Sequence, residues 1–149
     1  MGTQATYDDA NLILRLYELR REEKLRKARE WFARSFHATT LEELEKLCPR
    51  GTEENAYFRM LVGYWEMAAS LVASGVLHKE LFFENSGEFL FVWEKVRPVL
   101  QQWREISKNP TVGKNTEAVA KAFIEWLNAH APEAYAAYQA MLGRETPGR

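Results

Sequence analysis

The sequence predicts an all-α fold, an irregular bundle of about six or seven helices in a single domain that spans residues 1–149. Apolar residues recur at spacings of three and four along most of the chain, and no stretch alternates convincingly between apolar and polar residues. Apolar residues make up 46% of the chain and aromatic residues 13%, which suffices for a packed core. We expect frayed ends at residues 1–7 and 144–149.

Helix-start signals define the first three predicted helices. Two aspartates at the beginning of the segment 8–36 favour a helix N-terminus there. The sequence TLEE at 40–43 is a capping box that opens a short second helix, which Cys48-Pro49 ends. A central helix over 52–74 begins at a capping threonine that two glutamates follow, and it ends at a glycine.

Four further helices follow, separated by turn-forming residues. The first is a short helix over 78–85. The next is a long helix with a continuous apolar stripe, and it is kinked around Pro98 because proline lacks the N–H that would bond the carbonyl four residues earlier. A loop at 107–115 separates this helix from the last two, which are predicted over 116–130 and 132–143.

The segment 8–36 carries two apolar faces that point in nearly opposite directions. The first face is formed by Leu12, Leu16 and Leu19, and the second by the residues after the polar run RREEK at 20–24. Either the helix breaks at this run and folds back, or its first half projects and docks on another chain. We favour docking, because a projecting leucine ridge needs cover and a symmetric copy is the commonest cover. These three leucines are therefore the predicted homodimer interface.

The stretch LYELRREEKLRKAREWF at 16–32 is rich in basic residues, yet it lacks the pattern of a nucleic-acid-binding helix. Several glutamates stand four positions before a basic residue, so charges of both signs share one helix face. Carboxylates on a contact face would repel phosphate, and the net charge of the whole chain is only −1. We interpret the stretch as a solvated face and expect no nucleic-acid partner.

Location is predicted from three features of the chain. The longest stretch of low charge, 60–77, is interrupted by Glu66 and is better suited to a buried helix than to a membrane span. Cys48 is the only cysteine, which fits a reducing compartment. The first residues show no secretory signal. We therefore expect a cytoplasmic protein that does not associate with membranes.

The central helix is apolar nearly all round, apart from one narrow polar wedge formed by Arg59, Gly63, Glu66 and Ser70. A helix of this kind belongs in the middle of a bundle. One interpretation is that the wedge is a slot open to solvent. A second is that Glu66 forms a structural ion pair with an arginine. The candidate partners are Arg59, Arg97 and Arg104.

A third interpretation of the wedge is a ligand pocket between helices. Trp65, Trp93 and Trp103 would line the pocket, and Glu66 together with one of the three arginines would anchor the ligand. Helical bundles place sites of this kind in their interiors. The wedge therefore carries the alternative function, small-ligand binding, beside the interaction role.

Sequence motifs for catalysis and metal binding are missing. His37, His78 and His130 are isolated, without a Glu-x-x-His pair or an HExxH motif, so we expect no metal site. There is no glycine-rich phosphate loop and no GxSxG elbow, and no second titratable group is paired with Glu66 by spacing. We expect no catalytic residue, no cofactor and no enzymatic activity.

The stretch YWEMAASLVASGVLHKELFFENSGEFLFVWEKVRPVLQQWRE resembles bacterial domain-of-unknown-function family 4760, whose members are small helical proteins. The similarity lies in the order of its parts: a helix with an internal Glu66, a short acidic helix with aromatic residues, and then Trp93 on a helix ending in Arg104. The resemblance extends over about 12–106 and implies a helical fold without an established activity. Many members carry a membrane-spanning segment ahead of the helix that begins here near Asp8; no such segment stands in this sequence, so we expect no membrane tether.

The most consistent function is that of a cytoplasmic protein-interaction or structural module that acts as a homodimer. An unknown protein partner is also compatible with the sequence. The alternative is a ligand-binding bundle whose site lies at the polar wedge of the central helix. The homodimer depends on the leucine face of the first helix, whereas the ligand site depends on how the other helices surround the wedge.

Overall fold

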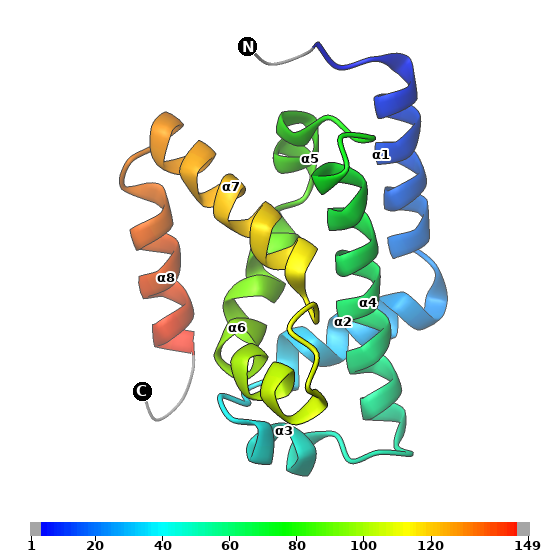
Figure 1. Ribbon diagram of the computed structural model, residues 1–149, viewed down its shortest axis with the longest axis vertical. Helices are drawn as coiled ribbons and strands as arrows, with labels where there is room; N and C mark the ends of the chain where they lie inside the picture. Colours follow the sequence, from blue (N-terminus) through cyan, green and yellow to red (C-terminus); the bar gives the residue numbers. More distant parts are fainter. Residues whose placement is uncertain (1–3, 146–149) are drawn as a thin grey trace.

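The computed structural model describes residues 4–145 and the side chains of residues 4–143. Within that part the chain forms eight α-helices and no strand (Figure 1). Of the ends expected to fray, 1–7 and 144–149, residues 1–3 and 146–149 lie outside the described residues. The other residues of these ends, 4–7 and 144–145, are described and include the start of α1 at Tyr7 and the end of α8 at Glu145. The helices are α1 (Tyr7–Arg20), α2 (Glu23–Ser35), α3 (Leu41–Leu47), α4 (Glu53–Ala73), α5 (Lys79–Asn85), α6 (Gly87–Ser107), α7 (Lys114–His130) and α8 (Ala134–Glu145).

Threonine caps begin three of the helices. Thr6, Thr40 and Thr52 each adopt an extended backbone conformation immediately before α1, α3 and α4. Each threonine side chain accepts a hydrogen bond from the backbone N–H three residues further on, which satisfies one of the amides that a helix N-terminus leaves free. The caps at Thr40 and Thr52 are those that the sequence predicts, so the starts of α3 and α4 are determined locally.

The helix predicted over 8–36 is in fact two helices, so the described chain has eight helices instead of the six or seven expected. α1 ends at Arg20, and the carboxylate of Glu22 accepts a hydrogen bond from the N–H of Leu25 at 3.0 Å, which caps the start of α2. The polar run at 20–24 therefore ends one helix and begins the next. Of the two interpretations of this segment, the break is the correct one.

The break changes which leucines of α1 are exposed. Leu16 is only 3% exposed and belongs to the core of its own chain, Leu12 is half-buried, and Leu19 is 39% exposed. The hydroxyl of Tyr64 on α4 also donates a hydrogen bond to the carbonyl of Leu16 at 2.6 Å. The expectation of a projecting ridge is therefore wrong for Leu16, because the chain folds back and its own helices cover that side chain.

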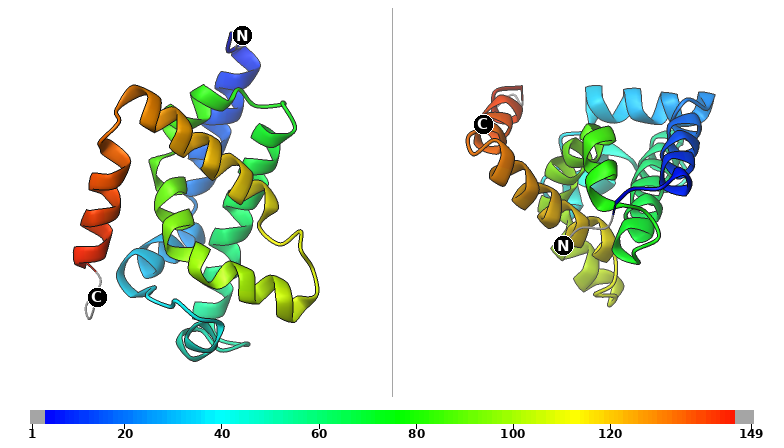
Figure 2. Two further views of the ribbon diagram at one scale, coloured as in Figure 1. Left: turned by 60° about the vertical axis from the view of Figure 1, so that its left-hand side comes forward. Right: turned by 90° about the horizontal axis from the view of Figure 1, so that it is seen from above.

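α4 is the central helix, as predicted. α2 and α7 both pack against it, and Figure 1 shows α7 crossing in front of α6, with its first turns beside α4, while α2 passes behind α4. The view from above in Figure 2 shows α2 and α7 along different edges of the bundle. Leu61 and Trp65 are fully buried, but Met67 is 40% exposed, so one strip of α4 faces water. The expectation that this helix is enclosed on nearly all sides is therefore wrong at Met67.

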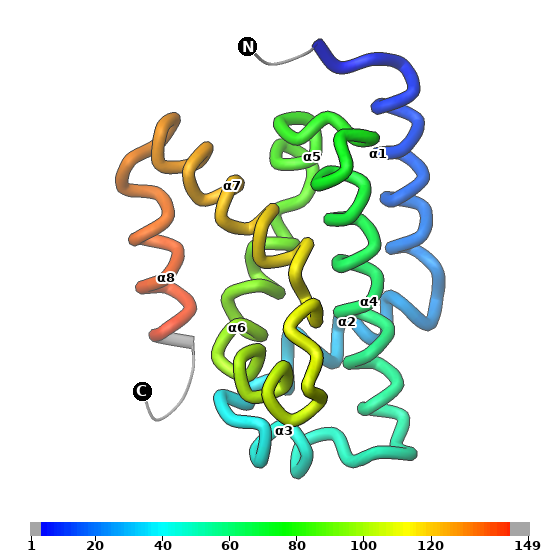
Figure 3. Tube along the Cα trace, in the orientation of Figure 1, coloured from blue at the N-terminus to red at the C-terminus, as the bar shows by residue number. Residues whose placement is uncertain are grey.

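The helix predicted to kink around Pro98 is α6, which continues through the proline. Figures 2 and 3 show α6 bending partway along its length. Pro98 has no N–H to donate to the carbonyl of Glu94, and this missing bond allows the bend. α7 contacts both α4 and α6 and closes one side of the region between them.

Candidate functional site

A cavity of about 260 Å³ lies between α4, α6 and the beginning of α7. Its lining is apolar except for Arg59, Glu66 and Thr116. Five of the seven residues predicted for the ligand site line it, namely Arg59, Trp65, Glu66, Trp93 and Trp103. The remaining lining residues are Val62, Gly63, Val92, Val96, Leu100, Val112, Gly113 and Thr116. The polar wedge of α4 therefore faces a largely apolar space.

Helical spacing explains how α4 and α6 form two walls of the cavity. Arg59, Val62, Gly63 and Glu66 are three, four and seven positions apart and so share one face of α4. The residues from α6 likewise follow the apolar stripe that the sequence shows between Val92 and Trp103. The third wall comes from the loop before α7 and from its first turn, which are distant in sequence and were not predicted.

Gly63 lies in the interior of α4 and lines the cavity. A Cβ atom added at this position would have no other heavy atom within 4 Å, and the backbone is not in the left-handed region that favours glycine. Glycine in a helix interior costs about 1 kcal/mol relative to alanine. Neither steric crowding nor backbone conformation requires this glycine, and its lack of a side chain leaves space in the cavity.

Glu66 caps α7. Its carboxylate oxygens accept hydrogen bonds from the amide and side-chain nitrogens of Asn115 at 3.2 and 2.8 Å, and from the amide and hydroxyl of Thr116 at 2.9 and 2.8 Å. The residue before α7 is Gly113, which has no side chain to cap the helix. Glu66 supplies the missing acceptor and places a negative charge at the helix N-terminus.

The three interpretations of the polar wedge did not include a cap of α7 by Glu66. The carboxylate forms no ion pair with Arg59, Arg97 or Arg104 in the described chain, and its hydrogen-bonding capacity is taken up by α7 rather than left for a ligand. Sequence reasoning missed the cap because the partners stand 49 and 50 positions further along the chain. The local signal was the absence of a capping side chain before α7.

Gly113 adopts a left-handed backbone conformation, with φ of +67°. A Cβ atom here would lie 2.9 Å from a methyl carbon of Leu100 on α6. The left-handed conformation favours glycine, and a Cβ atom would in addition displace the end of the Leu100 side chain. Gly113 therefore lets the start of α7 pack directly against α6 at the edge of the cavity.

Arg104 lies outside the cavity. Its guanidinium forms an ion pair with Glu117 at 3.1 Å and donates to the carbonyl of Val112 at 2.8 Å. The two contacts tie the end of α6 to the first turn of α7 and to the loop before it. Arg104, which was predicted to anchor a ligand, therefore does not line this cavity, and its guanidinium is engaged by Glu117 and Val112.

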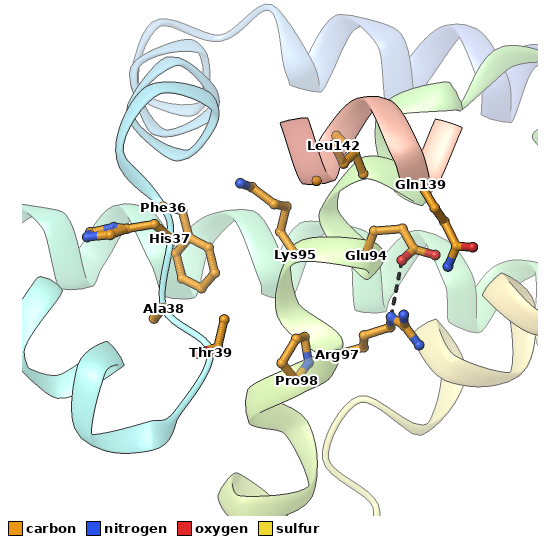
Figure 4. A pocket seen from close by; sticks show the side chains of 11 residues that line it. Phe36, His37, Ala38, Thr39, Glu94, Lys95, Arg97, Pro98, Gln139 and Leu142 are labelled. Atoms are coloured by element: carbon orange, nitrogen blue, oxygen red, sulfur yellow. Dashed lines mark ion pairs between the residues drawn. The ribbon is translucent and has the colours of Figure 1, made fainter. Parts of the chain in front are cut away.

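Arg97 lies in a second pocket, which Figure 4 shows from close by. This pocket, of about 180 Å³, lies between α6, α8 and the segment 36–39. Arg97 pairs there with Glu94 at 3.1 Å, and the side chain of Glu94 is only 6% exposed. The expectation that Arg97 contributes to the wedge is wrong, because it projects from the other side of α6.

The hydroxyl of Tyr135 on α8 donates a hydrogen bond to Glu94. Burial, together with this bond to the carboxylate, raises the pKa of Tyr135 to about 12. Gln139 in turn donates to the Tyr135 oxygen at 3.1 Å. This network fastens α8 to α6 and satisfies a buried carboxylate, which is a structural role.

Trp65, which lines the cavity, has an indole N–H without a hydrogen-bond acceptor among the described residues. The residue is fully buried, its ring packs against Tyr64 and Phe89, and the guanidinium carbon of Arg20 lies 5.2 Å from its ring centre. A buried N–H without an acceptor is uncommon in folded proteins.

Among residues 4–145 no helix is both long enough and apolar enough to cross a membrane. The same residues contain no group of three His, Cys, Asp or Glu side chains that could hold a metal ion.

Comparison with known proteins identifies a family. No curated protein and no solved structure matches the chain significantly. The profile of one family, described as Domain of unknown function (DUF4760), matches residues 5–141. This match covers nearly the whole chain and confirms the resemblance seen in the sequence. The chain therefore belongs to the DUF4760 family.

Proposed function

We propose that this protein binds a small, largely apolar molecule in the cavity between α4, α6 and α7. Support comes from the apolar lining and from the three tryptophans that contribute to it, Trp65, Trp93 and Trp103. Concave, mostly apolar sites with a few polar groups are typical of ligand pockets in proteins. Binding without catalysis is part of the proposal, because the one carboxylate in the lining, Glu66, is engaged in capping α7.

The cavity volume limits the size of the ligand. An apolar cavity of about 150 Å³ accommodates benzene, and a volume of 260 Å³ scaled in proportion corresponds to about ten non-hydrogen atoms. The proposed ligand is therefore of the size of a short alkyl chain or a substituted aromatic ring. A nucleotide or another large cofactor exceeds this volume.

The single observation that carries the proposal is Gly63. The chain places a helix-destabilising residue where the surrounding atoms leave room for a larger one. Gly63 is solvent-exposed and lines the cavity, so a larger side chain at this position would cover part of the opening. A cavity kept open by glycine is consistent with an occupant.

Nuclear magnetic resonance can test the proposal with n-octanol as the probe. Indole N–H signals of Trp65, Trp93 and Trp103 should shift on titration, while those of Trp31 and Trp126, which lie outside the lining, serve as internal references. Single Trp→Phe variants assign the signals. Equal shifts of all five indoles, or no shift at all, would contradict the proposal.

A cavity-filling variant sharpens this test. Gly63→Leu should occupy the space and abolish the n-octanol shifts, and Gly63→Ala, the smaller change, should weaken them. Ala73→Leu, at an exposed position of the same helix, is the matched control and should bind like the wild type. Undiminished binding by a folded Gly63→Leu variant would exclude this cavity as the site.

We propose self-association as a second function, through the outer face of α1. Tyr7, Leu14 and Tyr17 are 92%, 58% and 51% exposed, and their spacings of seven and three place them along one side of the helix. This face replaces the predicted one, in which Leu16 is buried. An unpartnered apolar stripe of this kind favours an interaction surface.

The charges of α1 favour a second copy of the chain as the partner. Its first turn carries the exposed Asp8, and the exposed Arg21 follows its last residue, with its guanidinium carbon 5.6 Å from the ring centre of Tyr17. In an antiparallel pair related by two-fold symmetry, the acidic end of one helix lies beside the basic end of the other. Light scattering should detect a dimer that Leu14→Glu dissociates; a wild-type monomer at high protein concentration would exclude the dimer.

A cytoplasmic location is part of this proposal and rests on the single, unpaired Cys48.

A further inference from the structure

We propose that the ligand of the cavity is an amphipathic acid, whose apolar body fills the cavity and whose carboxylate binds Arg59. This inference rests on the proposed function of the cavity between α4, α6 and α7, and it adds the chemical class of the ligand. Three features of the described residues carry it: the position of Arg59, the way its side chain is held, and the absence of a competing charge.

Arg59 lies at the boundary between two hollows of the surface. One is the apolar cavity, and the other is a wider groove formed by α3, the start of α4 and the end of α6. Only Arg59 and Trp103 line both. Arg59 is exposed, so its guanidinium stands where an apolar cavity meets water. An amphipathic molecule in the cavity would present its polar end at this boundary.

The Arg59 side chain is held in place by Asn55. The guanidinium Nε donates to the Asn55 side-chain oxygen at 3.0 Å, and the Asn55 side-chain nitrogen donates to the carbonyl of Cys48 at 3.0 Å. The Asn55 amide is also bonded to the Thr52 hydroxyl. This chain of contacts fixes Nε and leaves both Nη groups to form the paired hydrogen bonds that a carboxylate accepts.

Arg59 has no carboxylate partner among the described residues. Arg29, Arg97 and Arg104 are paired with Glu88, Glu94 and Glu117. The other charged group in the cavity lining, Glu66, already accepts four hydrogen bonds from the first turn of α7. A cationic ligand would find no available carboxylate in the lining, whereas an anionic one would find a guanidinium. The charged groups of the cavity lining therefore favour an anionic ligand, such as a carboxylic acid, over a cationic amine.

The test compares three probes with the same alkyl chain: octanoate, n-octanol and octylamine. Dissociation constants are measured from the indole shifts of Trp93 and Trp103 in the wild-type protein and in Arg59→Gln. We expect octanoate to bind about tenfold more tightly than the alcohol, because its carboxylate forms charge-assisted hydrogen bonds with Arg59. Octylamine should bind more weakly than both.

Arg59→Gln should abolish the preference for octanoate and leave the binding of n-octanol unchanged. The matched control is Arg34→Gln, which removes an exposed arginine of α2 that pairs with Glu30 and should preserve the preference. Arg59→Lys retains the charge and should restore part of the preference, which excludes a loss of folding as the cause.

The outcomes separate this inference from the proposed function. If none of the three probes shifts the indoles, the cavity is not a ligand site and both proposals fail. If n-octanol binds but octanoate binds no better, or if Arg59→Gln keeps the preference, the cavity is a ligand site and only the assignment of an acid is wrong.

Discussion

Glu66 on α4 holds the first turn of α7 through Thr116, which stands 50 positions later in the chain. One carboxylate oxygen of Glu66 accepts both the Thr116 amide, at 2.9 Å, and the Thr116 hydroxyl, at 2.8 Å. The pair joins the central helix to the helix that closes the cavity. The polar residue in the middle of an otherwise apolar helix thus has a structural role, and it sets one wall of the candidate site.

Removal of this cap should destabilise the protein. We expect Glu66→Ala to lower the free energy of unfolding by about 2 kcal/mol, because the amides and side chains of Asn115 and Thr116 lose their acceptor. Urea unfolding followed by circular dichroism measures the change. Glu125→Ala, at an exposed position within α7, is the control and should have an effect below about 0.5 kcal/mol. Equal effects of the two changes would argue against the cap.

Two glycines that line the cavity should respond to alanine with opposite signs. Gly63→Ala should raise the free energy of unfolding by about 0.5–1 kcal/mol, because the position is helical and unobstructed. Gly113→Ala should lower it by about 1–2 kcal/mol, because its φ is +67° and the new methyl group meets Leu100. Thermal unfolding measures both, at roughly 2–4 °C per kcal/mol for a chain of this size. A stabilising Gly113→Ala would contradict the left-handed conformation.

Two leucines on α1 should differ in their contribution to stability. Leu16 is 3% exposed and Leu14 is 58% exposed. We expect Leu16→Ala to lower the free energy of unfolding by about 3 kcal/mol, through lost burial and the cavity left behind, and Leu14→Ala to change it by less than about 0.5 kcal/mol. Urea unfolding at low protein concentration, where self-association is negligible, provides the comparison. A larger loss of stability in Leu14→Ala than in Leu16→Ala would instead support the predicted face, in which Leu16 projects from its own chain.

Asp9 should make the stability depend on pH in the acid range. The backbone amide of Thr6, at 2.8 Å, and that of His78, at 2.9 Å, donate to its carboxylate and hold the pKa of Asp9 below its ordinary value. The unfolded chain therefore takes up the proton at a higher pH than the folded one. The resulting stabilisation is complete above the ordinary pKa of about 3.9 and is lost as the pH falls through the lower folded-state pKa.

Asp9→Asn is the variant that checks this prediction. The difference in unfolding free energy between the wild type and Asp9→Asn should be constant near neutral pH and should shrink as the pH falls below about 4. Asp8→Asn, which makes the same change at the neighbouring exposed position of α1, is the matched control. A wild-type advantage that grows on acidification would show that the sign is wrong.

Much of the helical framework could be read from the sequence. The threonine caps at 40 and 52, the central helix α4 and the helix that continues through Pro98 were all predicted from patterns confined to a few neighbouring residues. The eighth helix was missed because the polar run at 20–24 is compatible with either a continuous helix or a break. Only the packing of Leu16, on α1, into the core of its own chain decides between them.

The candidate site was predictable in part. Spacing along α4 and α6 identified Arg59, Trp93 and Trp103 as residues that could share a pocket, since each helix presents one face to its neighbours. The pair of Glu94 and Arg97 has a spacing of three within α6 and could have been read from the sequence. The role of Arg104 was not predictable, because its partner Glu117 lies on α7. Ion pairs between two helices depend on which helices pack together, and the sequence does not show that packing directly.

The sequence by itself determined where most helices begin and end and which of their faces are apolar, because caps and periodicity act within one or two turns of the chain. Only the tertiary structure decided that Glu66 caps α7, that Leu16 is buried and that Gly63 faces an open cavity. These three facts depend on contacts between segments far apart in sequence. Such contacts follow from how several amphipathic helices fill space together, and no single helix specifies that arrangement.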